Sequence, residues 1–461
     1  QLGVTMDYSI FLLNCYEDNK KRFPGDKDRA MAHAISNTFK SVVGSSVTTI
    51  AGFVALCFMT FALGRDMGIV MAKGVVIGVI CCVTLLPSMI LLCDKAIEKT
   101  KHKTLLPSFD KVSNFITKHH IIWIAVFLVL LYPAIHGNNN VEVYYNIDTS
   151  LPASLPSNQA NKELEEVFNM NTVHMVLMEK GLDGKEKSEM LKEIEDVDGV
   201  QWALGLNSFV GPSFPESMIP KDVRSLLESD NYELQFICSD EVNGQISAIQ
   251  DIVKKYSPKG MVIGEAPLMK DLADVTDVDL KNVNVISIAA IFVIIMIVFK
   301  SISLPFILVA VIEFAIFVNM AVPYYQGITL PFVAGIVIGA IQLGATVDYA
   351  ILMTSRYQRE RHLGRGKKEA ISIAHKTSMK SIIISGCSFF AATFGVGLYS
   401  QVDMISSICT LLSRGAVIST VVVLLVLPAM FMIFDPIICH TSIGFLPKKE
   451  KEKPAGRSNK K

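Results

Sequence analysis

Two aspartate–tyrosine pairs are the residues of this sequence whose types and surroundings could do chemistry. Asp7-Tyr8 and Asp348-Tyr349 each lie inside a run of apolar residues. Asp348 precedes Arg356 by eight residues, which is about 12 Å along a helix. This places the carboxyl near the middle of a hydrocarbon core that is about 30 Å thick. A carboxylate at that depth is costly and has to face the protein interior or water.

The chemistry that this setting favours is proton transfer. Burial and a neighbouring carboxylate both favour the protonated form of an acid, so one of two adjacent aspartates could bind a proton near neutral pH. A proton that crosses 100 mV releases about 2.3 kcal/mol. The pattern predicts a proton relay of Asp7, Tyr8, Asp348 and Tyr349. The alternative is two structural aspartates satisfied by neighbouring hydroxyls, and the duplication of the whole motif favours the relay.

The two pairs belong to a repeated segment. Residues 1–16 match residues 342–357 at an offset of 341, with eight identities in sixteen positions. Each copy continues through a basic segment, a Lys-Ser pair, two apolar runs and a Leu-Pro. Both copies enter from the same side, so we expect a parallel internal repeat, as in transporters built from two like halves.

Small residues beside the aspartates predict close helix packing near the relay. Gly335, Gly339 and Gly344 line one helix, and Gly3 repeats Gly344. Glycines at such positions let two helices approach closely, which would bring the two aspartate helices together. The alternative is that glycine is merely common in membrane helices.

The composition indicates that membrane helices position these residues. Of the 461 residues, 51% are hydrophobic and 19% are charged, and the mean hydropathy is +0.42. Soluble domains have about a quarter charged residues, so a polytopic α-helical membrane protein is predicted and a nucleic-acid-binding protein or soluble enzyme is disfavoured. Residues 1–15 look like half of a span. Complete apolar runs lie at 42–63, 68–93, 120–136, 282–299, 303–322, 328–355, 381–399 and 412–434.

Charge is segregated along the chain. Residues 137–280 hold 26 of the 43 acidic residues but only 11 of the 43 basic ones. The segments 16–41, 94–119 and 356–380 and the tail are basic, and nine alternating crossings place all of them in the cytoplasm. The acidic segment then lies outside the membrane.

The acidic segment has the pattern of an α+β domain. Strand patterns cover 172–179, 235–239 and 261–264, and helical patterns cover 184–196 and 243–256. Residues 233–263 are interpreted as a split βαβ unit. A further helix at 271–284 is expected to run straight into the next crossing.

These patterns predict seven parts of the chain. We expect the end of a fourth transmembrane helix at 1–15, a fifth and sixth helix at 42–93, a cytoplasmic basic linker at 94–119 and a seventh helix at 120–136. An extracytoplasmic α+β domain is expected at 137–281, five further helices at 282–435 and a basic cytoplasmic tail at 436–461. Because Gln1 falls inside the first motif, we expect the chain to be truncated at its N-terminus. Cys238 is alone in the outer domain, which suits a bacterial surface better than a disulfide-rich animal ectodomain.

Other polar residues give weaker signals. The histidines, including His33 and His375, lack metal-ligand spacing, and the sequence has no phosphate-binding loop or nucleophile elbow. We therefore expect no enzyme, no metal and no cofactor. Asp66 with Lys73, and Asp403 with Arg414, are interpreted as surface ion pairs.

The chain resembles the RND superfamily and, within it, the MMPL-type exporters. The resemblance rests on Gly3-Val4-Thr5-Met6-Asp7-Tyr8 and Gly344-Ala345-Thr346-Val347-Asp348-Tyr349, and on the order of one crossing, an outer domain and five crossings. It implies that the outer domain is porter-like, that the two Asp-Tyr pairs relay protons, and that lipids or other hydrophobic molecules are moved outward. The second half departs from the family's signature at Asp403-Met404-Ile405 and Arg414-Gly415-Ala416.

Three functional hypotheses follow. The first is a secondary transporter that uses the proton-motive force to export a lipidic or hydrophobic substrate across a bacterial cell membrane. Its partners would be membrane lipids, the substrate and protons, with no nucleic acid; a homo-oligomer is left open. The second is a non-transporting membrane sensor or secretion-accessory protein, and the third is a sterol or terpenoid transporter of the Patched type. Two intact Asp-Tyr pairs favour the first, because a binding scaffold needs no buried acids.

Overall fold

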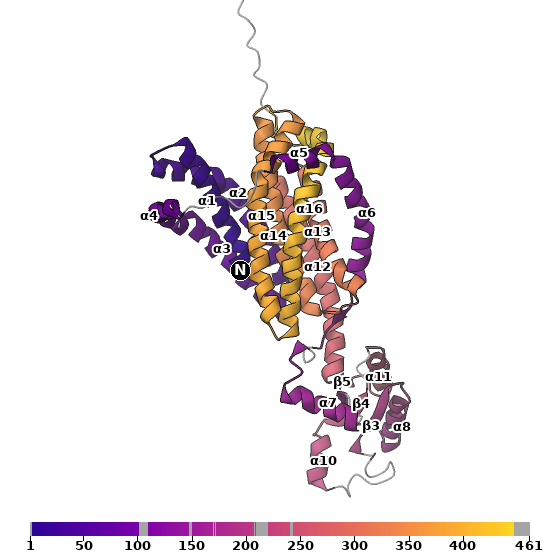
Figure 1. Cartoon of the computed structure of the whole chain (residues 1–461). Coiled ribbons are helices and arrows are strands. Elements are labelled where there is room, and N and C mark those ends of the chain that lie inside the picture. The colour runs from indigo at the N-terminus through magenta and orange to yellow at the C-terminus, as the bar shows by residue number, and fades with distance from the viewer. Residues whose placement is uncertain are drawn as a thin grey trace, which may run out of the picture. The chain divides into compact units, whose positions relative to one another are not determined.

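The computed structural model describes residues 2–100, 109–146, 150–168, 170, 172–206, 208, 220–239 and 243–446. The chain divides into two compact units, one of residues 1–144 with 279–461 and one of residues 145–278. The first unit is a bundle of long helices, and the second contains a small β-sheet (Figure 1). The protein is therefore mostly helical with a small α+β region.

The helical unit is built from long apolar helices. Among the described residues, eight helices are long and apolar enough to cross a membrane, and each of the eight complete apolar runs of the sequence overlaps one of them. The chain is a multi-pass membrane protein. Its helices are α1 (Leu2–Arg22), α2 (Lys27–Ala55), η1 (Leu56–Phe58), α3 (Ala62–Val83), α4 (Leu85–Lys99), α5 (Asp110–Lys118), α6 (His120–Asn139), α12 (Glu265–Phe299), α13 (Ser303–Gln326), α14 (Phe332–His362), α15 (Lys367–Tyr399) and α16 (Asp403–Thr441).

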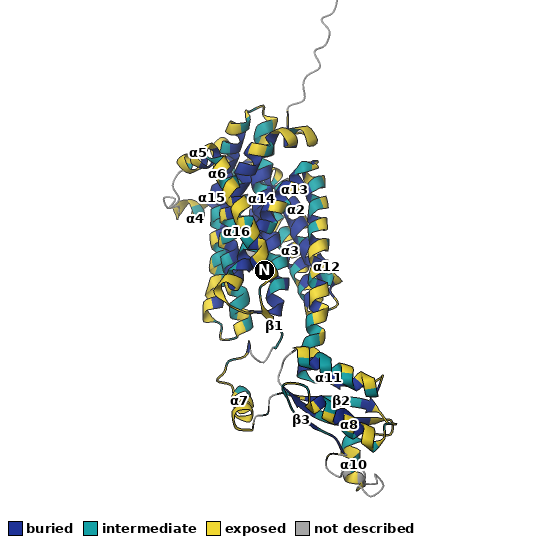
Figure 2. Cartoon of the chain, turned by 90° about the vertical axis from the view of Figure 1, so that its right-hand side faces the viewer, coloured by how far each residue is buried: buried dark blue, intermediate teal, exposed yellow. Residues whose placement is uncertain are grey.

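The helix α14 forms the centre of this bundle. In its most apolar stretch 89% of the residues are buried, against 17% in α6, and Figure 2 shows α14 in the dark blue of buried residues. It packs against α2, α13, α15 and α16. An acid on α14 is therefore enclosed by protein rather than by lipid.

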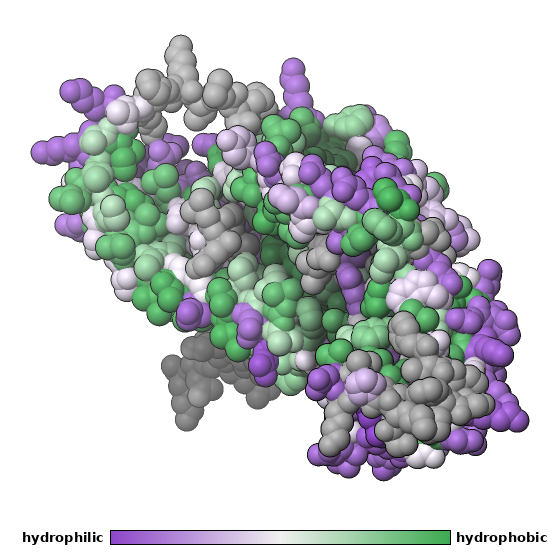
Figure 3. All heavy atoms as spheres, turned by 90° about the horizontal axis from the view of Figure 1, so that it is seen from below, coloured by the Kyte–Doolittle hydropathy of each residue, from purple (hydrophilic) through white to green (hydrophobic). Residues whose placement is uncertain are grey.

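The outer helices present apolar side chains on the surface of the bundle. Leu92, Val129 and Ile297 are 85%, 72% and 66% exposed, and apolar side chains cover broad areas in Figure 3. Soluble monomers rarely expose contiguous apolar areas of this kind. The surface thus suits a hydrocarbon surrounding.

The basic segments at 16–41 and 356–380 are mostly helical. α1 continues to Arg22 and α2 begins at Lys27, while α14 continues to His362 and α15 begins at Lys367. Lys, Arg and Glu are good helix formers, so the membrane helices extend beyond their apolar stretches. The end of the bundle where α1 and α14 end and α2 and α15 begin is called the basic end below.

The apolar run at 68–93 was expected to form one crossing, but it is divided between two helices. α3 ends at Val83 and α4 begins at Leu85, with Thr84 between them. The Thr84 hydroxyl donates to the Ile80 carbonyl at 2.7 Å, and Pro87 has no N–H to continue the hydrogen-bond ladder of α3.

The second unit has a four-stranded antiparallel sheet with the strand order β3-β4-β2-β5. β4 and β5 flank β2 and are joined by α11, which confirms the split βαβ unit predicted for 233–263. The strand β3 and the helix α7 were not predicted. The elements are α7 (Pro156–Phe168), β2 (Thr172–Glu179), α8 (Gly184–Glu195), β3 (Val200–Leu204), α10 (Lys221–Leu227), β4 (Tyr232–Ser239), α11 (Asn243–Tyr256) and β5 (Met261–Ile263).

The core of the second unit lies between this sheet and the helices α8 and α11. Val176 and Ile237 from the sheet meet Ile194 and Ile249 from the two helices, and all four are fully buried. Cys238 is buried in β4 and forms no disulfide. A small apolar core therefore folds this unit without cross-links.

The two units are joined through a continuous helix. α12 runs from Glu265 to Phe299, which confirms the helix predicted to continue into a crossing. In the helical unit a short parallel pair forms between β1 (Val143–Tyr144) and β6 (Leu330–Pro331). Asp279 of α12 is buried and accepts hydrogen bonds from the backbone N–H and hydroxyl of Thr60 and from the N–H of Phe61, at 2.8, 2.9 and 3.1 Å.

A buried polar network joins α13, α14 and α16. Asn319 Nδ2 donates to Gln342 Oε1 at 2.7 Å, and Arg414 Nε donates to Asn319 Oδ1 at 2.9 Å. Gln342 Nε2 donates to Ser419 Oγ at 3.2 Å, and the Ser419 and Thr346 hydroxyls share a hydrogen bond at 2.7 Å. Buried polar groups with satisfied partners fix helices in a single arrangement.

The predicted surface ion pairs are wrong. Arg414 bonds to Asn319 instead of Asp403, and Asp403 accepts a hydrogen bond from the Tyr144 hydroxyl at 2.6 Å. Asp66 and Lys73 likewise form no ion pair in the part of the chain that the structure describes. The seven-residue and eleven-residue spacings do not match the three- or four-residue spacing that brings helical side chains together.

Gly415 provides the space for this network, and its substitution tests the packing. A Cβ at position 415 would lie 2.7 Å from Gln342 Oε1 and 2.8 Å from Asn319 Nδ2. We expect Gly415→Ala to destabilise the protein by about 1–3 kcal/mol, measured as a lower thermal unfolding midpoint in detergent. Gly395→Ala in α15 is the control, because nothing lies within 4 Å of its added Cβ. An unchanged midpoint in Gly415→Ala would contradict the packing described.

Candidate functional site

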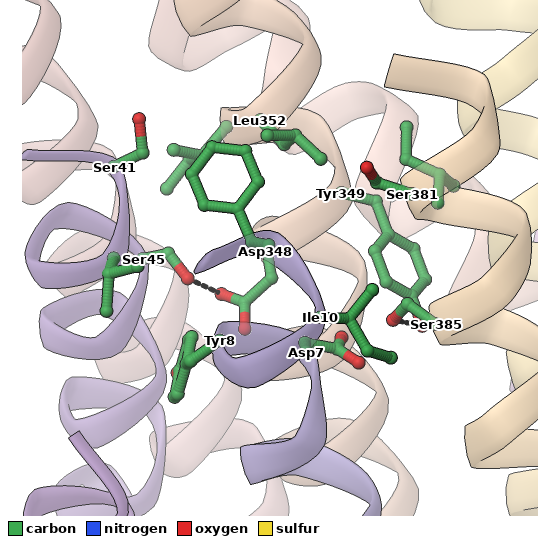
Figure 4. A pocket seen from close by; sticks show the side chains of 14 residues that line it. Asp7, Tyr8, Ile10, Ser41, Ser45, Asp348, Tyr349, Leu352, Ser381 and Ser385 are labelled. Carbon is green, nitrogen blue, oxygen red and sulfur yellow. Dashed lines mark hydrogen bonds between the residues drawn. The ribbon is translucent and has the colours of Figure 1, made fainter. Parts of the chain in front are cut away.

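The four residues predicted as a proton relay line one cavity. Asp7 and Tyr8 come from α1, and Asp348 and Tyr349 come from α14. The cavity has a volume of about 40 Å³ and is bounded by α1, α2, α14 and α15 (Figure 4). The fold thus brings together two motifs that are 341 residues apart in the sequence.

Asp348 is held by hydroxyls of α2. Ser45 Oγ donates to Asp348 Oδ1 at 2.6 Å, and Thr49 Oγ1 donates to the same oxygen at 3.2 Å. Tyr8 of α1 lies beside Asp348 in the same cavity (Figure 4), and its hydroxyl has no hydrogen-bond partner among the described residues. Asp348 is 7% exposed, so these groups are its surroundings in place of water.

Asp7 has a corresponding arrangement made by the other copy of the motif. It interacts with the hydroxyl of Ser385 on α15, and Ser385 Oγ also donates to the Tyr349 hydroxyl at 3.2 Å. Tyr349 lines the same cavity as Asp7. Figure 4 shows Ser45 and Tyr8 beside Asp348, and Ser385 and Tyr349 beside Asp7. Each acid is therefore surrounded by residues of the opposite sequence copy.

Two carboxylate oxygens in this cavity lack a partner. Asp7 Oδ1 and Asp348 Oδ2 are buried and have no hydrogen bond among the described residues, and the two carboxyls are close enough to interact electrostatically. An unpaired buried carboxylate is costly, and a proton on either acid removes their repulsion.

The four glycines that were predicted to pack near the relay have different positions. Gly344 adjoins the site, since a Cβ there would lie 3.0 Å from Thr49 Cγ2. Gly335 and Gly339 instead face Leu280 and Asn284 of α12. The structure describes Gly3 only as part of the α1 backbone, and its surroundings lie outside the described residues.

Contrary to the expectation, these glycines do not pack the two aspartate helices against each other. α1 packs mainly on α2 and α15, and α14 packs on the same two helices. The two aspartates therefore meet across a cavity that α1, α2, α14 and α15 surround.

The sequence analysis missed the hydroxyl partners of the acids. Ser45 and Ser385 occupy matching positions at an offset of 340, as do Ser41 and Ser381. The Lys-Ser pairs at the start of both copies were noted, and continuing the alignment by one helical turn would have found Ser45 and Ser385. Thr49 has no such signal, because Phe389 occupies its place in the second copy.

The sequence analysis also missed a tyrosine–aspartate–cation cluster that occurs once in each copy, at the basic end. The Tyr16 hydroxyl donates to Asp94 Oδ1 at 3.0 Å, and Lys20 Nζ lies 2.6 Å from the same oxygen. The second cluster is formed by Tyr357, Asp435 and Arg361, with Arg361 Nε 3.1 Å from Asp435 Oδ1. All three pairs of positions correspond at the offset of 341.

These clusters tie the end of each aspartate-bearing helix to the last helix of the same copy. The first joins α1 to α4, and the second joins α14 to α16. Burial opposes the charge of Asp94, but hydrogen bonds from Lys20, Lys27 and Tyr16 lower the pKa of this carboxyl to about 2. A lowered carboxyl pKa stabilises the fold above the unfolded-state pKa of about 4. The contribution of Asp94 is therefore complete at neutral pH and is lost as the pH falls toward 2.

One further acid lies inside the bundle, away from this site. Glu313 is in the middle of α13 and forms no hydrogen bond or ion pair with the described residues. It does not line the cavity of the aspartates.

Fold and site together define the class of the protein. Helices that span the membrane, a small α+β unit and a pair of acids enclosed between the helices are features of membrane transporters. The sequence matches the MMPL family over residues 1–123 and 221–453, which is more than half of the chain. The chain belongs to the MMPL family of membrane transport proteins, related to the RND superfamily, and this confirms the resemblance found in the sequence.

Individual relatives are distant. The membrane protein YdgH of Bacillus subtilis is 26% identical over 255 residues, which cover 53% of this chain and 28% of YdgH. The probable transport protein MmpL12 of Mycobacterium tuberculosis is 22% identical over 346 residues, covering 70% and 29%. The siderophore exporter MmpL5 of the same species is 23% identical over 199 residues, covering 41% and 20%. The chain spans less than a third of the length of these relatives.

The basic-end clusters generate a prediction about stability. Asp435→Asn leaves Arg361, which is 14% exposed, without its counter-charge. Removing one partner of a buried ion pair costs about 3–5 kcal/mol, so the thermal unfolding midpoint in detergent should fall clearly. Glu166→Gln is the matched control, because the Lys162–Glu166 pair is 71% and 65% exposed and should contribute less than about 1 kcal/mol. Equal midpoints for the two variants would contradict a stabilising cluster.

Proposed function

We propose that this protein is a secondary transporter that exports a lipidic or hydrophobic substrate across the cell membrane at the expense of the proton gradient. One observation carries the proposal: Asp7 and Asp348 share a cavity in which each acid is surrounded by groups of the opposite copy. Protonation of an acid changes its attraction for those groups, so it changes the contact between the two copies.

The proposal includes a parallel internal repeat and an orientation. The matching positions of the Asp-Tyr pairs, the serines and the basic-end clusters support two halves of like construction. The basic end would face the cytoplasm by the positive-inside rule, and residues 145–278 would then form a porter-like unit outside the membrane. Protonation would bias a rocking motion of one half against the other.

The family supports transport, and the relatives suggest the kind of substrate. MmpL5 is a siderophore exporter, and MmpL12 is a probable transport protein. The apolar surface of the bundle gives a membrane-dissolved substrate access to the protein from the lipid. A sensor or secretion-accessory protein on the same scaffold remains the outcome that a transport measurement has to exclude.

Substitution of either aspartate tests the proton relay. Asp7→Asn and Asp348→Asn keep the shape of the side chain but cannot bind and release a proton. In the protein at its natural full length, reconstituted in liposomes with an internal pH dye, each variant should lose substrate-stimulated proton flux by about a hundredfold or more. Tyr349→Phe should be impaired less, because it keeps the ring and loses only the hydroxyl.

The outcomes separate the candidate functions. Normal proton flux in either asparagine variant, with normal folding by size-exclusion chromatography, would refute the relay. No flux in the wild-type protein under any lipid or detergent-like substrate pool would favour the sensor or secretion-accessory function.

A pair of neighbouring serines tests whether the opposite copy controls each acid. Ser45→Ala removes the 2.6 Å hydrogen bond to Asp348, whereas the buried Ser46 bonds only to the Val42 and Val43 carbonyls of its own helix. Hydrogen bonds to a charged group contribute about 1.5–3 kcal/mol, so Ser45→Ala should lower proton flux about tenfold or more. Ser46→Ala should leave it nearly unchanged. Equal effects of both substitutions would show that the hydrogen bond to Asp348 has no special role.

A further inference from the structure

The polar lining of the aspartate cavity continues past the acids toward the basic end. Ser41 and Ser45 on α2 are one helical turn apart, as are Ser381 and Ser385 on α15. All four line the same cavity as the aspartates, and Figure 4 shows them on its two sides. Ser45 and Ser385 lie at the level of the acids, and Ser41 and Ser381 lie one turn nearer the basic end. A hydroxyl both donates and accepts hydrogen bonds, so it can take part in a chain of hydrogen bonds that moves a proton.

The two sides of the cavity differ between Ser41 and Ser381 and the basic end. Asn14 Nδ2 donates to Ser381 Oγ at 3.2 Å, and Asn14 follows Asp7 by seven residues, which places it on the same face of α1. The matching residue in the other copy is Ser355, whose hydroxyl donates to the Ile351 carbonyl of its own helix at 2.8 Å. Within the described part of the chain, Ser355 forms no hydrogen bond with Ser41. The side of Asp7 therefore has an interhelical hydrogen bond beyond the acids, whereas the matching residue on the side of Asp348 bonds within its own helix.

Apolar groups bound the cavity between these two sides. Phe11 and Leu352 follow the aspartates by four residues each and line the cavity. The Arg356 guanidinium lies 5.8 Å from the centre of the Phe11 ring, so a cation covers that ring on α1. Asp18 is one helical turn past Asn14 on α1, and its side chain is 77% exposed. Solvent is thus reached one turn beyond Asn14.

We propose that protons leave the aspartate pair along one side of the bundle, by a path formed by Ser385, Ser381 and Asn14 that opens to solvent at Asp18. This path deepens the proposed function and rests on it. The proton leaves the Asp7 carboxyl and is exchanged along hydrogen-bonded water and the two serine hydroxyls, and an equal proton leaves near Asp18. Only O–H bonds break and form. The cavity of about 40 Å³ exceeds the roughly 10–15 Å³ that one water requires.

Asn14 has a positioning role in this path. An amide does not exchange a proton at neutral pH, but its Nδ2 donates to Ser381 Oγ and so directs the Ser381 O–H away from Asn14. The direction away from Asn14 along α15 leads to Ser385 and the acids. Replacement of Asn14 by an apolar residue should therefore slow the release of protons at the basic end without altering the uptake of protons by the two acids.

The test compares matching serines of the two copies in the natural full-length protein, reconstituted in liposomes with an internal pH dye and an imposed proton gradient. Ser381→Val and Asn14→Leu should each lower proton flux about tenfold or more. Ser381→Thr keeps the hydroxyl and should stay within about twofold of the wild type, and so should the matched control Ser41→Val. Should Ser381→Val fold poorly, Asn14→Leu on the other helix gives the same comparison with Ser41→Val.

A second readout separates slow release from damage to the site. A hydrophobic carbodiimide reacts with a protonated carboxyl, and its labelling of Asp7 and Asp348 is measured by mass spectrometry of peptides. Labelling should persist in Ser381→Val, because proton uptake is intact and only release is slow. Equal flux in Ser381→Val and Ser41→Val, or lost labelling in Ser381→Val, overturns the one-sided path and leaves the proposed function standing. Absence of flux in the wild type overturns the proposed function, and the path with it.

Discussion

The structure depends on two carboxyls inside the helical bundle whose polar neighbours come from the opposite copy of the motif. Asp348 of α14 receives hydrogen bonds from Ser45 and Thr49 of α2, and Asp7 of α1 interacts with Ser385 of α15. An ionised acid in the middle of a bundle is stable only while those donors are in reach. The contact between the copies and the charge of the acids are therefore linked, and a change in either changes the other.

Other interactions stabilise the packing away from the two acids. At the basic end, Asp94 and Asp435 tie the aspartate-bearing helix of each copy to its last helix. On another side of α14, Gln342 is bonded to Asn319 and Ser419, and the absence of a side chain at Gly415 leaves room for this network. These buried, satisfied networks resist rearrangement, whereas the small cavity between α1, α2, α14 and α15 is where packing is incomplete.

The matching positions of the repeated sequence differ in the polar groups that they carry. Thr49 gives Asp348 a second hydroxyl, and Phe389 stands at the matching position beside Asp7. Asn14 bonds across to Ser381, and its counterpart Ser355 bonds to its own helix. Such differences make the polar surroundings of the two acids unequal.

The sequence by itself determined the class of the protein and the acids at its centre. Apolar runs report membrane helices because hydrocarbon offers the backbone no hydrogen bonds, and Asp7 and Asp348 stand out because charged residues are costly there. Alternating apolar residues likewise predicted the strands β2, β4 and β5. The tertiary structure alone decided which hydroxyls meet each acid, that Gly335 and Gly339 face α12, and that Arg414 bonds to Asn319 instead of Asp403. These contacts join residues tens to hundreds of positions apart, and their geometry depends on how helices rotate and pack, which no local pattern encodes.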